Sequence, residues 1–373
     1  MRVLVAPDKF RGTLTAPQAS HAMALGWLRE RPGDEMSELP LADGGEGTLE
    51  ALVDAHGGSL RRASVTGPLG DPVEAAFGLV QGPSGPVGIV EMARASGLGL
   101  ASRRDPLRAS TRGTGELIGQ ACGAGARTVV VCIGGSATSD GGAGMAEALG
   151  ARLLDGSGRP IPPGGAGLIE LARIDLSGLE PALRSVRVVA ASDVDAPLTG
   201  PKGAAQVFGP QKGASREDVL LLDRALGHLA AVIARDIGID VRGIRGAGAA
   251  GGLGAGLVAF LGARIRPGVE VVMEAVGFEG RLAVADMVLT GEGRFDASSL
   301  TGKVVGGVLA AAREAGVAAA VLCGDAEIRP EGVEVASLVE RFGRERALGQ
   351  ARSALVELAA EVAARAGKLG SPR

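Results

Sequence analysis

Apolar runs and amphipathic segments alternate at both ends of the chain. The first apolar run, residues 2–6, predicts a buried strand, and Thr15 followed by Gln18 has the form of a capping box. The N-terminal part is thus expected to contain strands at 2–6 and 35–40 and helices from 16 to about 29 and through His56. The C-terminal part predicts strands at 285–289, 317–323 and 333–338 and helices at 303–315 and 347–366. This alternation is typical of a parallel sheet covered by helices.

The pattern changes near residue 60. Residues 60–65 and 73–80 flank the turn-forming segment 66–72, which predicts a hairpin or meander. Further strands are expected at 87–92, 128–133 and 186–191, and helices at 116–122, after residue 144 and from 216 to 237. We therefore predict an α/β fold in which a doubly wound parallel-sheet domain is interrupted by an inserted mixed α/β domain.

Composition narrows the class of protein. The chain has 373 residues, too many for one compact core, with 46% hydrophobic residues and a net charge of −3. With one Trp, seven Phe and no Tyr, it lacks the aromatic side chains on which single-stranded nucleic acids stack. No basic field would attract nucleic acid or an anionic membrane. We expect neither partner.

Cysteine usage and the N-terminal sequence indicate a compartment. Three cysteines without metal-ligand spacing fit a reducing environment. The N-terminus runs directly into a strand and lacks the features of a signal peptide, and no apolar stretch is long enough to span a bilayer. These observations predict a cytoplasmic protein.

Lysine is rare, and its positions suggest phosphate chemistry. Only five of the 39 basic residues are lysines. Lys9, Lys202, Lys212 and Lys303 fall in glycine-rich segments, whereas Lys368 lies in the C-terminal tail. A lysine retained where arginine is otherwise preferred can be required as a compact point charge for a phosphate. Lys202, in a plain Gly-Pro-Lys-Gly turn with no strand before it, is the weakest of the four.

The ends of the predicted strands carry acids and bases among glycines. In open parallel sheets ligands bind outside the carboxyl ends of the strands. The candidates at these ends are Asp8 and Lys9; Asp43, Gly44, Gly45 and Glu46; Asp140; Asp193 and Asp195; Glu292, Arg294 and Asp296; and Asp325. A cleft between two domains, with phosphate-binding turns and Mg²⁺-binding carboxylates, would need such groups.

The segment 134–144 joins a predicted buried strand to a helix. Its glycines would let an anion approach converging backbone N–H groups. Gly134, Gly135, Gly141 and Gly142 supply the backbone, and Ser136, Thr138 and Asp140 supply side chains. We predict a cradle for a phosphate or carboxylate here; a tight turn with Asp140 as helix N-cap is the structural alternative.

Three other segments have both a functional and a structural interpretation. Asp43 and Glu46 resemble a capping box, yet two glycines between them cost helix stability. Lys303 is expected at a helix start, where the dipole disfavours a cation unless an anion binds. Lys212 is expected in a turn that closes over substrate, or simply in an exposed loop.

Other familiar chemistries are not supported. The chain has no Gly-x-x-x-x-Gly-Lys-Ser/Thr, which argues against a P-loop enzyme. Residues 246–251 match a dinucleotide fingerprint, but 241–245 form a poor strand, so close helix packing is the preferred interpretation. The three histidines lie on predicted helices away from any candidate nucleophile, which makes a Ser–His or Cys–His hydrolase improbable.

Taken together, six segments resemble the bacterial glycerate kinase family. They are residues 6–14, 42–48, 133–145, 192–213, 246–256 and 290–303. The resemblance implies transfer of the ATP γ-phosphoryl group to D-glycerate, giving 2-phosphoglycerate. It also implies a flavodoxin-like domain at 1–62 and 243–373 and a restriction-enzyme-like inserted domain at 63–242. The family usually has Asn at the positions of Ser139 and Ala196; this chain contains no Asn at all.

A phosphoryl-transfer mechanism assigns roles to the candidates. Asp8 or Asp193 would accept the hydroxyl proton, and Lys9, Lys212 and Lys303 would neutralise the transferring group. Asp193, with Glu292 or Asp296, would hold Mg²⁺, and Arg294 would bind the substrate carboxylate. Residues 134–142 and 43–46 would contact phosphate or substrate.

Several alternatives stay open. The product could be 3-phosphoglycerate, or the substrate a related hydroxy acid. The chain could also be a dinucleotide-dependent oxidoreductase or a non-catalytic nucleotide or anion sensor. A homodimer is compatible with the sequence, which does not fix the oligomeric state.

Overall fold

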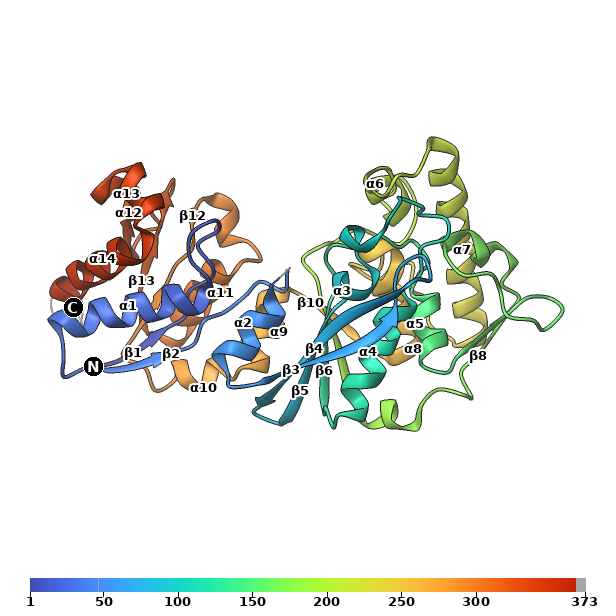
Figure 1. Ribbon diagram of the computed structural model, residues 1–373, viewed down its shortest axis with the longest axis horizontal. Coiled ribbons are helices and arrows are strands. Elements are labelled where there is room, and N and C mark those ends of the chain that lie inside the picture. Colours follow the sequence, from blue (N-terminus) through green and yellow to red (C-terminus); the bar gives the residue numbers. More distant parts are fainter. Residues whose placement is uncertain (46, 367–373) are drawn as a thin grey trace. The chain divides into compact units, whose positions relative to one another are not determined.

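The computed structural model describes residues 1–45 and 47–366 and divides into two compact units (Figure 1). Unit 1 contains residues 1–43, 50–57 and those from 272 onward, and unit 2 contains residues 44–49 and 58–271. Unit 1 is therefore assembled from both ends of the chain. The predicted α/β fold with parallel strands is confirmed.

A five-stranded parallel sheet forms the centre of unit 1. Its strands are β1 (Arg2–Val5), β2 (Glu35–Glu38), β11 (Met287–Thr290), β13 (Ala318–Cys323) and β15 (Glu334–Ser337). Their spatial order is β15-β13-β11-β1-β2, and every neighbouring pair is parallel. Counted along the chain, this is the 2-1-3-4-5 order of doubly wound flavodoxin-like sheets, as the resemblance implied.

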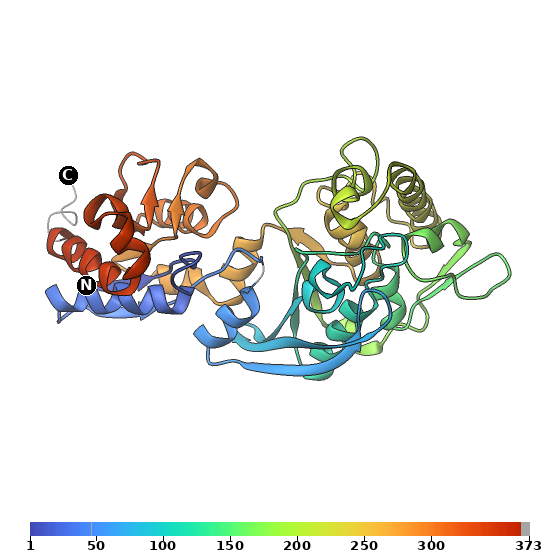
Figure 2. The same ribbon diagram turned by 45° about the horizontal axis from the view of Figure 1, so that its top comes forward.

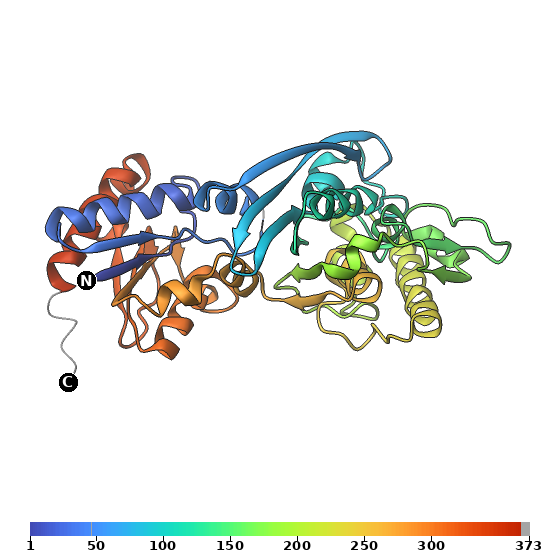
Figure 3. The same cartoon turned by 90° about the horizontal axis from the view of Figure 1, so that it is seen from below.

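Helices cover both faces of this sheet. Helices α1 (Ala16–Glu30) and α14 (Ala351–Ala366) pack side by side (Figure 3). The fully buried Trp27 lies in their shared core. Thr15 and Gln18 form the predicted capping box of α1. The other elements of unit 1 are α2 (Thr48–Ala55), α9 (Gly268–Ala275), α10 (Phe278–Leu282), β12 (Arg294–Phe295), α11 (Val304–Ala315), β14 (Asp325–Ala326), α12 (Leu338–Phe342) and α13 (Arg344–Gly349), of which α2 and α9 begin in unit 2.

Unit 2 is built on a six-stranded mixed sheet. Its strands are β3 (Ser59–Thr66), β4 (Pro72–Gly82), β5 (Gly85–Glu91), β6 (Thr128–Cys132), β9 (Arg187–Ala191) and β10 (Arg264–Arg266). The order is β10-β9-β6-β5-β4-β3, antiparallel from β3 to β5 and parallel beyond. The hairpin predicted around residues 66–72 is the β3–β4 turn. A separate ribbon of β7 (Arg152–Leu154) and β8 (Arg173–Asp175), green in Figure 2, was not predicted.

The helices of unit 2 enclose its main core. They are α3 (Ala93–Ser96), α4 (Arg112–Gly123), α5 (Ala143–Ala148), α6 (Ala204–Phe208), α7 (Arg216–Asp236) and α8 (Leu253–Leu261). Ser215 and Asp218 form a capping box at the start of α7, the helix predicted from residue 216. In the described part of the chain, no helix is both long and apolar enough to cross a membrane.

Residues 243–271 belong to unit 2. The family resemblance implied that they belong to the first domain. Strand β10 pairs in parallel with β9, and Leu253, Leu257 and Phe260 of α8 lie in the core of unit 2. The strand was missed because two of its three residues are arginines. The chain returns to unit 1 at Val272.

Candidate active site

In unit 1, the strand order reverses between β1 and β11. Ligands of doubly wound sheets bind at such a point, outside the carboxyl ends of the strands. The segments that leave β1 and β11 are joined there by backbone hydrogen bonds, from Ala6 N–H to the Leu289 carbonyl at 2.7 Å and from Asp8 N–H to the Gly291 carbonyl at 2.8 Å. Two of the predicted candidate segments thus lie side by side.

Asp8 is a buried acid at this reversal point. Burial, followed by the negative charge of Asp43, raises the pKa of Asp8 to about 7, and Glu292 adds to the shift. The backbone N–H of Lys9, which donates to Asp8 Oδ1 at 2.7 Å, and the Lys9 charge act in the opposite direction. Near neutral pH the Asp8 carboxyl group can therefore both accept and release a proton.

Glu292 follows β11, and one of its carboxylate oxygens has no hydrogen-bond donor among the described residues. Burial raises its pKa, while a hydrogen bond from Ser299 and the charge of Lys303 lower it. The side chain is buried, and its Oε1 accepts no hydrogen bond from the part of the chain that the structure describes. A buried carboxylate oxygen is costly without a partner. A cation or a hydrogen-bond donor of a ligand would satisfy it.

Asp296, Arg294 and Lys303 follow on the same segment. Asp296 accepts hydrogen bonds from Ser298 N–H at 2.8 Å and from Ser298 Oγ at 2.5 Å, which lower its pKa. Lys303 is the N-cap residue of α11, and its Nζ donates to Ser298 Oγ at 2.7 Å. Arg294 is exposed and pairs with Glu327 within unit 1, so a substrate carboxylate would compete with that partner, and its role in substrate binding stays a prediction.

In unit 2, Lys212 is buried against the segment that follows β6. It ends a short 3₁₀ turn at residues 210–212, and its Nζ donates to Ser136 Oγ at 3.2 Å and to the Thr138 carbonyl at 2.5 Å. Burial lowers its pKa to about 8, although the charge of Asp140 opposes the shift. Lys212, expected in a turn that closes over substrate or in an exposed loop, is thus buried in this structure. Gly134 and Gly135, in contrast, lie exposed at the start of the segment.

Asp140 is fully buried and accepts several hydrogen bonds. Thr111 donates to it through N–H at 2.8 Å and Oγ1 at 2.9 Å, and Gly142 and Gly144 donate through N–H at 3.2 Å each. At the start of α5, the backbone N–H groups of Gly142 and Gly144 are thus used by Asp140, and that of Met145 donates to Thr111 Oγ1. Burial raises the pKa of Asp140, and these hydrogen bonds partly offset that rise.

The glycines next to Asp140 serve close packing. A Cβ atom on Gly141 would lie 2.2 Å from Leu229 Cδ2, and one on Gly144 would lie 2.0 Å from Ser110 Oγ. The arrangement differs from the cradle predicted over the whole segment: the half from Asp140 to Gly144 lies in the interior, where no anion can approach it. Only its beginning, at Gly134 and Gly135, is open to solvent.

The remaining candidates of unit 2 lie near the ends of β9 and α9. Asp193 Oδ1 accepts a hydrogen bond from Gly268 N–H at 3.0 Å, and Asp195 pairs with Arg245 at 2.5 Å. A Cβ atom on Gly44, which has φ +82°, would lie 3.0 Å from Gly268 Cα. The Gly45 carbonyl accepts from Thr48. Glu46, and with it the predicted capping box with Asp43, lies outside the described residues.

Comparison with known proteins identifies the family. The model of the glycerate kinase family matches residues 3–369. The chain belongs to the glycerate kinase family. It is 50% identical over 315 residues to a glycerate kinase of Bacillus subtilis, covering 84% of this chain and 82% of that one. It is 46% identical over 316 residues to a glycerate 2-kinase of Escherichia coli, with 84% and 82% covered.

A solved structure shares the fold of this kinase family member. A crystal structure from Salmonella typhimurium LT2, assigned as a glycerate kinase 2, superposes with a TM-score of 0.89, at 44% identity and 99% coverage of both chains. The resemblance inferred from the sequence is thus confirmed, and with it the class of enzyme, a phosphotransferase.

The dinucleotide fingerprint of this kinase family member has a packing role. Residues 241–245, directly before it, form a turn and no strand, and Gly251 and Gly256 lie against the segment that follows β6. A Cβ atom on Gly251 would be 2.0 Å from the Thr138 carbonyl oxygen. Close approach of two backbones explains these glycines.

Two residues at the site were missed from the sequence. Thr111 is 29 positions from Asp140, and nothing local connects them. Glu91, buried at the end of β5, accepts from Leu49 N–H at 2.9 Å and from Arg94 Nε at 2.7 Å. Glu91 could have been found from the sequence, because it is an acid at the end of an apolar strand, the same pattern that identified the other candidates.

Proposed function

We propose that the protein transfers the γ-phosphoryl group of ATP to the 2-hydroxyl group of D-glycerate, producing 2-phosphoglycerate. The relatives named as glycerate kinases, at 45–50% identity, support glycerate as the acceptor. The Escherichia coli relative is named a glycerate 2-kinase, which supports the position of transfer. ATP is the general phosphoryl donor of kinases.

The observation that carries the proposal is the buried Asp8 at the reversal point of the unit 1 sheet. Its pKa of about 7 is close to the ambient pH, the condition under which a general base is most effective. We assign it the acceptance of the hydroxyl proton as the phosphoryl group transfers. Phosphoryl transfer requires little else from the protein than positioning and charge neutralisation.

Lysines supply positive charge in this proposal. Lys9 follows Asp8 directly, and Lys303 reaches Ser298 across the segment that also carries Glu292 and Asp296. They neutralise charge that accumulates on the transferring group. Lys212, held by Ser136 and Thr138, fixes the segment whose exposed beginning, Gly134 and Gly135, would contact a phosphate or the glycerate carboxylate.

Mg²⁺ is the metal this chemistry implies, and the donors in unit 1 fit it. Enzymes usually hold Mg²⁺ through one or two carboxylates together with substrate phosphates. Glu292 has a buried carboxylate oxygen that no donor of the described chain reaches, and hydrogen bonds lower the pKa of Asp296 and keep it ionised. Among the described residues no three His, Cys, Asp or Glu side chains form a metal cage, so phosphate oxygens would complete the shell. In unit 2, Asp193 is the carboxylate that the sequence analysis proposed as a Mg²⁺ ligand. The ion would neutralise phosphate charge.

Phosphorus NMR of the reaction with ATP, Mg²⁺ and D-glycerate tests the proposal. We expect the resonances of 2-phosphoglycerate and of ADP, and with Asp8→Asn we expect them to appear about 10²- to 10⁴-fold more slowly. A 3-phosphoglycerate resonance would refute the position of transfer. Consumption of ATP with tartronate or lactate but not with glycerate would refute the substrate, and absence of turnover despite ATP binding would indicate a sensor.

A further inference from the structure

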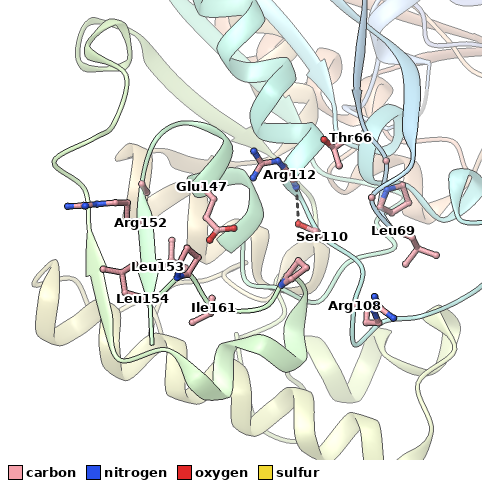
Figure 4. A pocket seen from close by; sticks show the side chains of 16 residues that line it. Thr66, Leu69, Arg108, Ser110, Arg112, Glu147, Arg152, Leu153, Leu154 and Ile161 are labelled. Carbon is pink, nitrogen blue, oxygen red and sulfur yellow. Dashed lines mark hydrogen bonds between the residues drawn. The ribbon is translucent and has the colours of Figure 1, made fainter. Parts of the chain in front are cut away.

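Unit 2 contains a pocket that none of the proposed catalytic residues lines. Its volume is about 470 Å³, within the range of small-molecule sites. The β3–β4 turn, the segment before α4, helix α5 and the β7 region enclose it (Figure 4). Its walls are mainly apolar, with Leu69, Leu153 and Ile161 among them.

One carboxyl group points into this pocket without a hydrogen-bond partner. Glu147 lies on α5, and in Figure 4 its carboxyl group is directed into the space between Ser110 and Leu153. It accepts no hydrogen bond within the described chain. Burial raises its pKa to about 7, even though the charge of Arg112 acts to lower it. An ammonium group of a ligand would compensate the ionised carboxylate that the protein leaves unpaired.

A guanidinium group lies on the opposite side of the pocket. Arg108 is exposed, lies next to Leu69 in Figure 4, and has no ion pair or side-chain hydrogen bond in the described residues. The other two arginines of the lining are engaged, Arg112 with Glu116 and Arg152 with Asp175. Within the described chain, the pocket thus offers one unpaired carboxyl group, of Glu147, and one unpaired guanidinium group, of Arg108, at opposite sides, with apolar side chains between them.

We propose that this pocket binds a short linear zwitterion, with its ammonium end on Glu147, its carboxylate end on Arg108 and an apolar body against Leu69, Leu153 and Ile161. An ω-amino acid or a short apolar peptide has this chemistry. The site is separate from the proposed phosphoryl-transfer residues and does not depend on them.

Calorimetric titration of the full chain with four probes tests the proposal at a pH where Glu147 is ionised. 6-Aminohexanoate carries both charges on an apolar spacer, hexanoate lacks the ammonium group, hexylamine lacks the carboxylate, and β-alanine lacks the spacer. We expect 6-aminohexanoate to bind and each of the others to bind at least about tenfold more weakly, as for the loss of one charge-assisted contact or of apolar burial.

Two substitutions test which residue binds each end of the ligand. Glu147→Gln should abolish the preference for 6-aminohexanoate over hexanoate, and Arg108→Gln should abolish the preference over hexylamine. Glu170→Gln, an exposed glutamate of the same unit that does not line the pocket, is the matched control and should bind all probes as the parent does. No binding of 6-aminohexanoate, or equal affinity for all four probes, would overturn the proposal.

Discussion

The backbone N–H of Asp8 donates to the carbonyl oxygen of Gly291 at 2.8 Å. This bond joins the segment that follows the first strand of the chain to the one that follows β11, 283 positions later. It brings Asp8 and Glu292 close enough that the charge of Glu292 contributes to the raised pKa of Asp8. The raised pKa of Asp8 therefore contains a contribution from a residue near the other end of the sequence, beside the larger effects of burial and of Asp43.

Asp8→Asn should remove the proposed base. We expect a loss of turnover of about 10²- to 10⁴-fold, the usual contribution of general base catalysis. In the parent enzyme, turnover should rise as the pH increases through the Asp8 pKa of about 7, because the ionised form accepts the proton. Initial rates across pH, with the exposed Asp54→Asn as control, measure both effects. A flat profile and an active Asp8→Asn enzyme would contradict the assignment.

Asp8→Asn, which should lower turnover, should at the same time raise the stability of the folded protein at alkaline pH. The folded pKa of Asp8 lies above its unfolded value of about 3.9, so the folded state holds the proton more tightly. Its contribution to stability is present below the unfolded pKa and is lost as pH rises through about 7. Asn carries no charge, so Asp8→Asn should melt at a higher temperature than the parent in alkaline buffer, with a smaller difference in acid. Thermal unfolding at both pH values measures it.

Lys9→Arg and Lys303→Arg should each lose turnover, by about 10²-fold if a compact charge on the transferring group is required. The guanidinium keeps the positive charge but is larger and differently hydrated. Both variants should keep the parent melting temperature. The exposed Lys202→Arg, in a turn without a strand before it, is the control. Near-parent rates in the first two variants would show that charge alone suffices.

The elements were largely predictable because their signals are local. The capping boxes at Thr15 and Ser215 and the apolar runs of β1, β6 and β13 mark helices and strands from the sequence alone. Strand β10 was missed because Arg264 and Arg266 are polar, and its pairing with β9 comes from tertiary contacts. That omission moved the expected domain boundary.

The site was predictable as a set of positions but not as a set of contacts. Strand ends correctly placed Asp8 and Glu292 just beyond the carboxyl ends of β1 and β11, and Lys303 lies at the start of a helix, as predicted. The burial of Lys212 and its bond to Thr138 join residues 74 positions apart, and no local pattern encodes them. The glycines after Asp140 suggested an anion cradle, whereas their absent side chains make room for Leu229 and Ser110.

Asp140→Ala should destabilise unit 2 strongly. It would leave the buried N–H groups of Thr111, Gly142 and Gly144 without an acceptor and Lys212 without a nearby negative charge. We expect a loss of about 3–5 kcal/mol in the free energy of unfolding. Asp240→Ala, which removes an exposed acid paired with Arg242, should cost much less. Urea unfolding compares the two. Equal costs would show that the buried network contributes little.

Gly144→Ala and Gly134→Ala separate packing from binding in the segment after β6. A Cβ atom on Gly144 meets Ser110 Oγ at 2.0 Å and Arg112 N at 2.8 Å, whereas one on Gly134 meets no atom within 4 Å. Gly144→Ala should therefore lose about 1–3 kcal/mol of stability through overpacking, and Gly134→Ala should fold as the parent does.

Turnover of these two variants then tests the exposed end of the segment. If Gly134 contacts a phosphate or the glycerate carboxylate, Gly134→Ala should raise the KM for ATP or glycerate at unchanged melting temperature, because its methyl group meets the ligand and not the protein. Steady-state kinetics with each substrate varied in turn measures this. Parent values of both KM and kcat would place the ligand away from Gly134 and contradict a binding role for the exposed end of this segment.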